Sequence, residues 1–117
     1  MYREIKIGDK TVPMLANGAT PVRYRMVFGK DILSEFQSAD KDSGRAASSV
    51  TELAFIMNKA AEAQENKAVL SNLNQESFVE WLEQFEPLDI TMASDAIVDL
   101  YTSNGVGLSE AKKKQKG

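Results

Sequence analysis

The chain of 117 residues contains no cysteine and no histidine. Without cysteine it has neither a disulfide framework nor a thiolate nucleophile, which suits a reducing compartment such as a cytoplasm. Without histidine it lacks the commonest general base and the commonest ligand of transition metals. No stretch approaches the roughly 18 consecutive apolar residues that a membrane-spanning helix needs, so we expect no membrane partner.

Motifs that carry catalysis or bind phosphate are also missing. A nucleophile would have to be serine, threonine, lysine or a carboxylate, and the sequence has no Gly-x-Ser-x-Gly motif. The Gly-Lys pair within Phe28–Asp31 lacks the upstream glycine and the following Ser/Thr of a phosphate-binding loop. No set of residues with matched catalytic roles can be assembled. We therefore predict that the protein is not an enzyme and has no catalytic or cofactor-binding residues.

Two acidic patterns resemble sites but do not predict them. Residues 40–51 begin like a calcium loop, which requires glycine at its sixth position and glutamate at its twelfth. The chain has Arg45 and Thr51 there, so we expect no metal site. Asp95 and Asp99 lie four residues apart, and we interpret them as the solvated face of a helix because surface carboxylates are common.

Charge is distributed unevenly around a net value of −3. Residues 1–40 carry six basic and five acidic side chains, residues 41–111 carry four and twelve, and the last six residues carry four lysines. The acidic middle repels nucleic acid phosphates. The stretch Arg23-Tyr24-Arg25 is therefore weak evidence for nucleic acid, and we expect a protein partner with a basic or mixed surface.

The overall composition predicts a single small domain. Hydrophobic residues make up 43% of the chain and charged residues 26%, as is usual for globular proteins. We place the domain at residues 1–105 and a flexible basic tail at residues 106–117. A core of this size is modest, so we also expect self-association.

The first residues predict a β-hairpin at residues 2–16. Ile5 and Ile7 alternate with polar residues, and Gly8-Asp9 separates them from a second short run. Pro13 lacks a backbone donor, so the second strand should lie at a sheet edge.

Two helices are expected next. Thr20 and Pro21 are typical of a helix start, and we predict a helix at 21–37 with a bend at Gly29. Its apolar positions are Val22, Met26, Val27, Ile32, Leu33 and Phe36. The polar segment 38–48 is interpreted as a loop.

The Ser49–Glu52 stretch matches a capping box and predicts a helix at 49–67. This helix should be the best buried in the chain. Its apolar face consists of Val50, Leu53, Ala54, Met57 and Ala61.

Two further helices complete the fold, at residues 75–86 and about 90–103. Asn74 caps the first and Pro87 ends it. The inward positions expected in the second are Met92, Ala96, Ile97, Leu100 and Tyr101. The fold class is therefore α+β, predominantly helical: an N-terminal hairpin followed by about four helices.

The most aromatic stretch is SFVEWLEQFEPLDI, Ser77–Ile90. Phe78, Trp81, Leu82 and Phe85 share one stripe at helical spacing, which first of all predicts core. A partly exposed Trp81 or Phe85 with glutamates around it would instead anchor a partner. The two interpretations do not exclude each other.

Three stretches resemble the tail assembly chaperones of long-tailed phages and prophages of Gram-positive bacteria. They are VRYRMVFGKDI at Val22–Ile32, SSVTELAFIMNKAAEA at Ser48–Ala63, and Ser77–Ile90. The order of the pieces along residues 1–103 is similar as well. The shared features are patterns of apolar and charged residues, not catalytic signatures.

The resemblance implies a function without catalysis. Such proteins bind and coat the tape measure protein before the tail tube polymerises around it, and they recruit tail tube subunits. They act in the host cytoplasm and are absent from the mature virion. A longer form made by ribosomal frameshifting commonly accompanies them, and Lys112-Lys113-Lys114 can be encoded by the A-rich run that slippage requires.

Contact residues do not follow from the resemblance, so we chose them from the sequence. The expected partner contacts are Trp81, Phe85, Leu88, Phe28 and Ile32. The alternative function is a structural virion component, such as a small head–tail connector subunit. Presence in purified virions distinguishes it from a chaperone.

Overall fold

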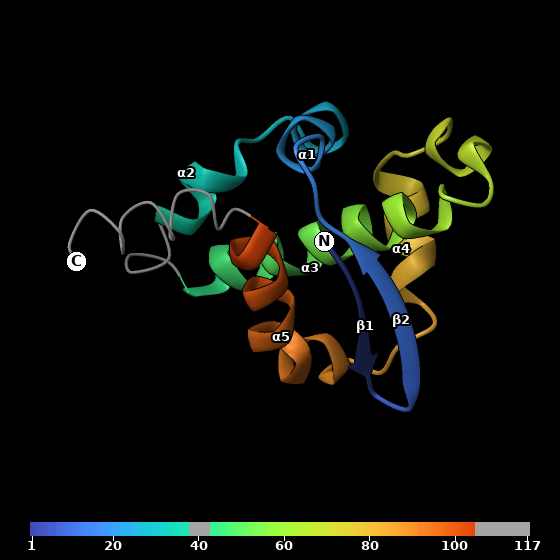
Figure 1. Ribbon diagram of the computed structural model, residues 1–117. Helices are drawn as coiled ribbons and strands as arrows, with labels where there is room; N and C mark the ends of the chain where they lie inside the picture. The colour runs from blue at the N-terminus through green and yellow to red at the C-terminus, as the bar shows by residue number, and fades with distance from the viewer. Residues whose placement is uncertain (38–42, 105–117) are drawn as a thin grey trace, which may run out of the picture.

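The computed structural model describes residues 1–37 and 43–104 of the chain. Two strands are followed by helices, which confirms the α+β, predominantly helical prediction (Figure 1). The elements are β1 (Tyr2–Ile7), β2 (Lys10–Leu15), α1 (Thr20–Phe28), α2 (Ile32–Gln37), α3 (Ser43–Glu62), the 3-10 helix η1 (Lys67–Leu70), α4 (Gln75–Leu82) and α5 (Asp89–Asn104). No helix within the described ranges is long and apolar enough to cross a membrane.

The N-terminal hairpin forms as the alternation predicts. β1 and β2 pair antiparallel, with Ile5 opposite Val12. The turn between the strands requires a positive φ of 64° at Gly8, which glycine adopts without strain. Ile5, Ile7, Val12 and Met14 are buried on one face. The hairpin therefore has one face for the core and one for water.

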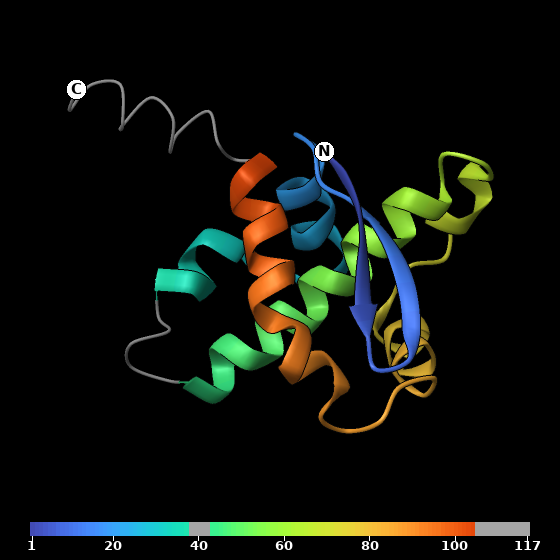
Figure 2. The ribbon, with the colours of Figure 1, turned by 60° about the horizontal axis from the view of Figure 1, so that its bottom comes forward.

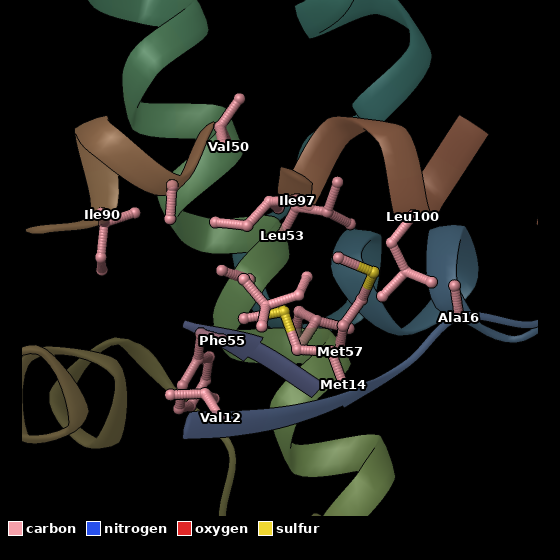
Figure 3. Packing of buried hydrophobic residues seen from close by; sticks show 14 of the residues in the cluster. Val12, Met14, Ala16, Val50, Leu53, Phe55, Met57, Ile90, Ile97 and Leu100 are labelled. Carbon is pink, nitrogen blue, oxygen red and sulfur yellow. The ribbon is translucent and has the colours of Figure 1, made fainter. Parts of the chain in front are cut away.

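Helix α3 lies at the centre of the molecule. The hairpin packs across it and α5 runs beside β1 (Figures 1 and 2). Side chains of β2, α3 and α5, including Met14, Leu53 and Ile97, point toward one another (Figure 3). The whole segment Leu53–Met57 is fully buried, because neighbours surround α3 on every side rather than on one apolar stripe. The prediction that this helix is the best buried is confirmed.

The helix predicted at 21–37 is two helices. Gly29 has φ 69° and ends α1 in the left-handed conformation. The helix therefore terminates at Gly29 and does not continue through it with a bend. A new helix begins after Asp31, whose side chain accepts a hydrogen bond from the Leu33 backbone N–H at 3.0 Å. Ile32 is buried, whereas Leu33 is exposed.

The predicted limits of the next helix, 49–67, are wrong at both ends. Helix α3 begins at Ser43 and ends at Glu62. Ser49 is not a cap: it is buried inside the helix, and its hydroxyl donates to Glu35 Oε1 on α2 at 3.1 Å. Ser49, which was predicted to cap the start of the helix, instead makes the contact with α2.

The C-terminal helices also differ in detail from the prediction. Asn74 caps α4, as expected, and Ser77 completes a capping box with it, but the helix ends at Leu82 and not at Pro87. On α5, Met92 and Ala96 are exposed, so their predicted inward positions are wrong. Ile97 and Leu100 are buried as predicted, and together with positions 90 and 93 they pack against β1 and α3. The predicted tail, residues 106–117, lies outside the described residues.

Candidate functional site

The expected partner contacts lie in two different environments. Trp81, Phe28 and Ile32 are buried in the core, so they are not accessible to a partner in this structure. Phe85 is half-buried. Leu88 is 68% exposed and remains available. Four of the five residues therefore contribute to packing, and Leu88 is the one of the five left at the surface.

Trp81 shows how the stripe is held in the core. Its ring packs edge-on against Phe55 at 5.5 Å and Phe85 at 5.0 Å between centroids. The indole N–H donates to Asn58 Oδ1 at 2.8 Å, and the Asn58 amide donates to the Pro13 carbonyl at 2.8 Å. The stripe's interpretation as core is confirmed, and α4 is thereby connected to α3 and β2.

The largest unexpected feature is the outer side of α1. Thr20, Tyr24 and Phe28 face the core, yet Val22 is 58% and Met26 is 78% exposed. Helix α1 is therefore apolar on two sides. A surface helix normally has a single apolar stripe facing the core, so the outer stripe lacks the cover that such residues usually have.

The outer stripe of α1 forms one wall of a groove of about 380 Å³. The other wall comes from the segment around η1, on the same side of α3 (Figure 1). We call this the α1 groove. The described residues that line it are Ala19, Val22, Arg23, Met26 and Val27 of the α1 segment and Leu70, Ser71 and Leu73 around η1. Its volume lies within the roughly 300–1,000 Å³ of ligand-binding clefts.

The groove residues on the α1 side recur at intervals of three and four, so they form a continuous helical stripe. They are Ala19, Val22, Arg23, Met26 and Val27. Helical spacing grouped Val22 and Met26 with Val27 as one apolar set of this helix. The missed signal was Tyr24 and Phe28, a second apolar pair four residues apart. With both pairs present, only one stripe of α1 can face α3.

A polar network holds the inner side of α1 against α3. The Tyr24 hydroxyl donates to Glu52 Oε1 at 2.6 Å, and Lys30 Nζ lies 2.8 Å from the same oxygen. Burial and the hydrogen bond to Glu52 raise the pKa of Tyr24 above its ordinary value of 10.0. The buried Glu35 carboxylate lies 3.9 Å from Lys30. These contacts fix the orientation of α1, so its outer stripe faces the groove.

A second apolar surface lies at the start of α5. Leu88 and Met92, 68% and 83% exposed, are one turn apart. Glu86 and Asp89 are close by, and the Glu86 backbone N–H donates to Asp89 Oδ2 at 2.9 Å. We call Leu88 and Met92 the α5 surface. It is apolar with acidic neighbours, whereas the α1 groove is lined by an arginine.

A further hollow of about 380 Å³ lies between β2 and α4. It is lined in part by Pro13, Asn58 and Trp81, whose polar groups already bond to one another. Lys10 and Thr11 also line this hollow, which offers a ligand less apolar surface than the α1 groove.

Reactive chemistry is not concentrated at either apolar surface. Within residues 1–37 and 43–104, no group of three acidic side chains is arranged to hold a metal ion. Asp99, one of the two carboxylates considered from the sequence, accepts an exposed ion pair from Arg3 at 2.8 Å. What the α1 groove offers is nonpolar contact area and one guanidinium.

Comparison of the chain with known protein families, curated proteins and solved structures found no match.

Proposed function

We propose that this protein is a tail assembly chaperone, which binds and coats the tape measure protein and helps to recruit tail tube subunits. The assignment to phage tails rests on the resemblance of Val22–Ile32, Ser48–Ala63 and Ser77–Ile90 to that family. It places the protein in the host cytoplasm during assembly and outside the mature virion. We further propose that a longer form of the protein is made by ribosomal frameshifting and that the protein self-associates.

The observation that supports a coating function is the uncovered apolar stripe of α1. Val22 and Met26 are exposed although the inner side of the same helix fills the core. A tape measure protein exposes long apolar helical faces until the tube closes around it, and a partner that covers those faces prevents aggregation. A groove beside a helix is a common way to bind another helix.

Coating does not require a tight single site. Many copies bound along one rod gain avidity when neighbouring copies also contact one another. The two apolar surfaces, the α1 groove and the α5 surface, are separate features of the chain. One copy can therefore contact both a rod and a neighbour.

The test is co-expression with the neighbouring tape measure protein, followed by size-exclusion chromatography with light scattering. We expect a soluble complex with many copies of this chain per rod. A tape measure protein that stays insoluble while this chain elutes alone would contradict the chaperone function. Adding tail tube protein to the purified complex then tests recruitment.

The protein content of purified virions distinguishes a chaperone from a head–tail connector subunit. A chaperone is absent from them, whereas a head–tail connector subunit is present in a fixed number of copies. The frameshifted form is tested on the gene: the codons for Lys112–Lys114 should contain a slippery heptamer with no stop codon interrupting it.

A further inference from the structure

The α1 groove is basic on its α1 side, in contrast to the acidic stretch 41–111 of the chain. Helix α1 contains Arg23 and Arg25 and no acidic residue, in a protein with net charge −3. Arg23 lines the groove, and Arg25 lines an adjoining hollow of about 170 Å³ together with Val22 and Asp31, whose carboxylate accepts a hydrogen bond from the Leu33 backbone N–H. Within the described part of the chain neither guanidinium forms an ion pair. Both are available to a partner.

We propose that the α1 groove binds the apolar face of an amphipathic helix that carries acidic residues beside its apolar stripe. The proposal deepens the proposed function, on which it rests for the identity of that helix as a segment of the tape measure protein. Val22, Met26 and Leu70 receive the apolar anchors. Arg23 and Arg25 pair with the flanking carboxylates, for which the arginine fork is well shaped.

The length of the groove fits a partner with several anchors. The α1 stripe runs from Ala19 to Val27, about 12 Å at 1.5 Å per residue. That distance corresponds to about two turns of a bound helix, which presents apolar residues at i, i+3 or i+4, and i+7. The groove therefore matches three anchors in a row.

A second copy of this chain is the competing occupant. Its α5 surface is apolar and has acidic neighbours, so the sign of the charge is right. It presents only Leu88 and Met92, one turn of helix, and the Asp89 carboxylate beside them already accepts a backbone hydrogen bond. Two anchors leave part of the stripe uncovered, which favours a separate protein as the occupant.

The first test uses two synthetic peptides of roughly 20 residues, above the length at which isolated helices become marginal. Both carry leucines at the same i, i+3, i+7 positions, but one has glutamates beside them and the other lysines. Titrated into the full-length protein, the glutamate peptide should bind about tenfold more tightly, because each arginine attracts one peptide and repels the other. NMR shifts should concentrate at residues 19–27 and 70–73. Equal affinities, or shifts centred on residues 88–92, would overturn the proposal.

Variants assign the effect to the groove. Met26→Asp should weaken binding of the glutamate peptide at least about tenfold, and Arg23→Glu with Arg25→Glu should reverse the preference between the peptides. Met92→Asp is the matched control: it places the same charge on a similarly exposed methionine outside the groove and should leave peptide binding unchanged. A loss of binding in Met92→Asp equal to that in Met26→Asp contradicts the assignment.

Light scattering of the free protein, without peptide, tests whether a second copy of the chain occupies the α1 groove. If Met26→Asp and Met92→Asp each abolish self-association of the free protein, the groove holds the α5 surface of a neighbour and the proposal is wrong. If self-association survives Met26→Asp, a second copy does not occupy the groove. The groove is then free to bind another protein, which supports the proposal.

Co-expression with the tape measure protein distinguishes a failure of the proposed chaperone function from a failure of the groove assignment. If Met26→Asp and the double arginine variant still form the tape measure complex, the chaperone function stands and the groove assignment falls. If the peptides are discriminated but no tape measure complex forms, the groove stands with a different helical partner.

Discussion

At the scale of single residues, the indole of Trp81 joins three parts of the fold through Asn58 and the Pro13 carbonyl. Trp81→Phe keeps one aromatic ring but removes the donor and part of the ring system, which leaves Asn58 Oδ1 without that partner. We expect a loss of about 1–3 kcal/mol in the free energy of unfolding, measured by urea denaturation followed by circular dichroism. Leu88→Ala, at an exposed position, should stay within about 0.5 kcal/mol; equal losses would contradict the role of this hydrogen bond.

Two glycines with similar backbone angles make a second residue-scale prediction. Gly8 and Gly29 have φ 64° and 69°, so alanine should cost about 1–2 kcal/mol at either position. A Cβ at Gly8 would also collide with Asp89 Oδ2, whereas nothing lies within 4 Å of a Cβ at Gly29. Thermal unfolding should therefore show a larger loss for Gly8→Ala than for Gly29→Ala. Gly18→Ala, with open space around it, is the control, and equal losses at Gly8 and Gly29 would exclude the contact with Asp89.

At the scale of elements, the attachment of α1 to α3 depends on protonated Tyr24. Its pKa is raised in the folded protein, so the stabilisation is complete below pH 10 and is lost as the pH rises above that value. In this range the unfolded chain gives up the proton first, and stability should fall by up to about 1.4 kcal/mol per pH unit. Urea denaturation between pH 9 and 11 measures this slope.

Tyr24→Phe provides the comparison for that slope. The variant should lose only about 0.5–1.5 kcal/mol at pH 7, because Glu52 keeps Lys30 at 2.8 Å. Above pH 10 its stability should fall less steeply than that of the wild type. An unchanged slope would mean that Tyr24 does not link α1 to pH.

Elements with a local signal were predictable from the sequence. The hairpin follows from alternation and a Gly-Asp turn, and the start of α4 follows from Asn74, because each signal acts within a few residues. The limits of α3 were not predictable, since Ser49 is a good cap that tertiary contact with Glu35 places inside the helix. The exposure of Met92 likewise depends on where β1 and α3 lie, which periodicity alone does not define.

The candidate site was less predictable than the fold. Aromatic residues were expected at the contact surface, but a small domain needs its largest rings in the core, and Trp81 and Phe28 are there. Val22 and Met26 fit helical spacing as well, yet they lie outside the core. The sequence identified α1 and α4 as apolar, but which side each helix buries depends on α3 packing against them.

At the scale of the whole molecule, the hairpin and the helices should unfold together. A two-stranded hairpin alone is at best marginal, and here Ile5, Ile7, Val12 and Met14 contribute directly to the core around α3. Ile7→Ala should cost about 2–5 kcal/mol. Hydrogen exchange should show the same loss at the amides of β1 and at those of residues 53–57. Leu33→Ala, at an exposed position, should leave both unchanged; loss confined to β1 would mean that the hairpin opens by itself.

The two-sided character of α1 also provides an optical reporter. Phe28 on its inner side contacts the rings of Phe55 and Phe78, and Phe55 contacts Trp81, the only tryptophan in the chain. A helix bound to the outer side presses on the same backbone that positions Phe28. A shift in tryptophan emission during titration would therefore report occupancy of the α1 groove without any label, because a continuous row of aromatic rings connects α1 to the chromophore.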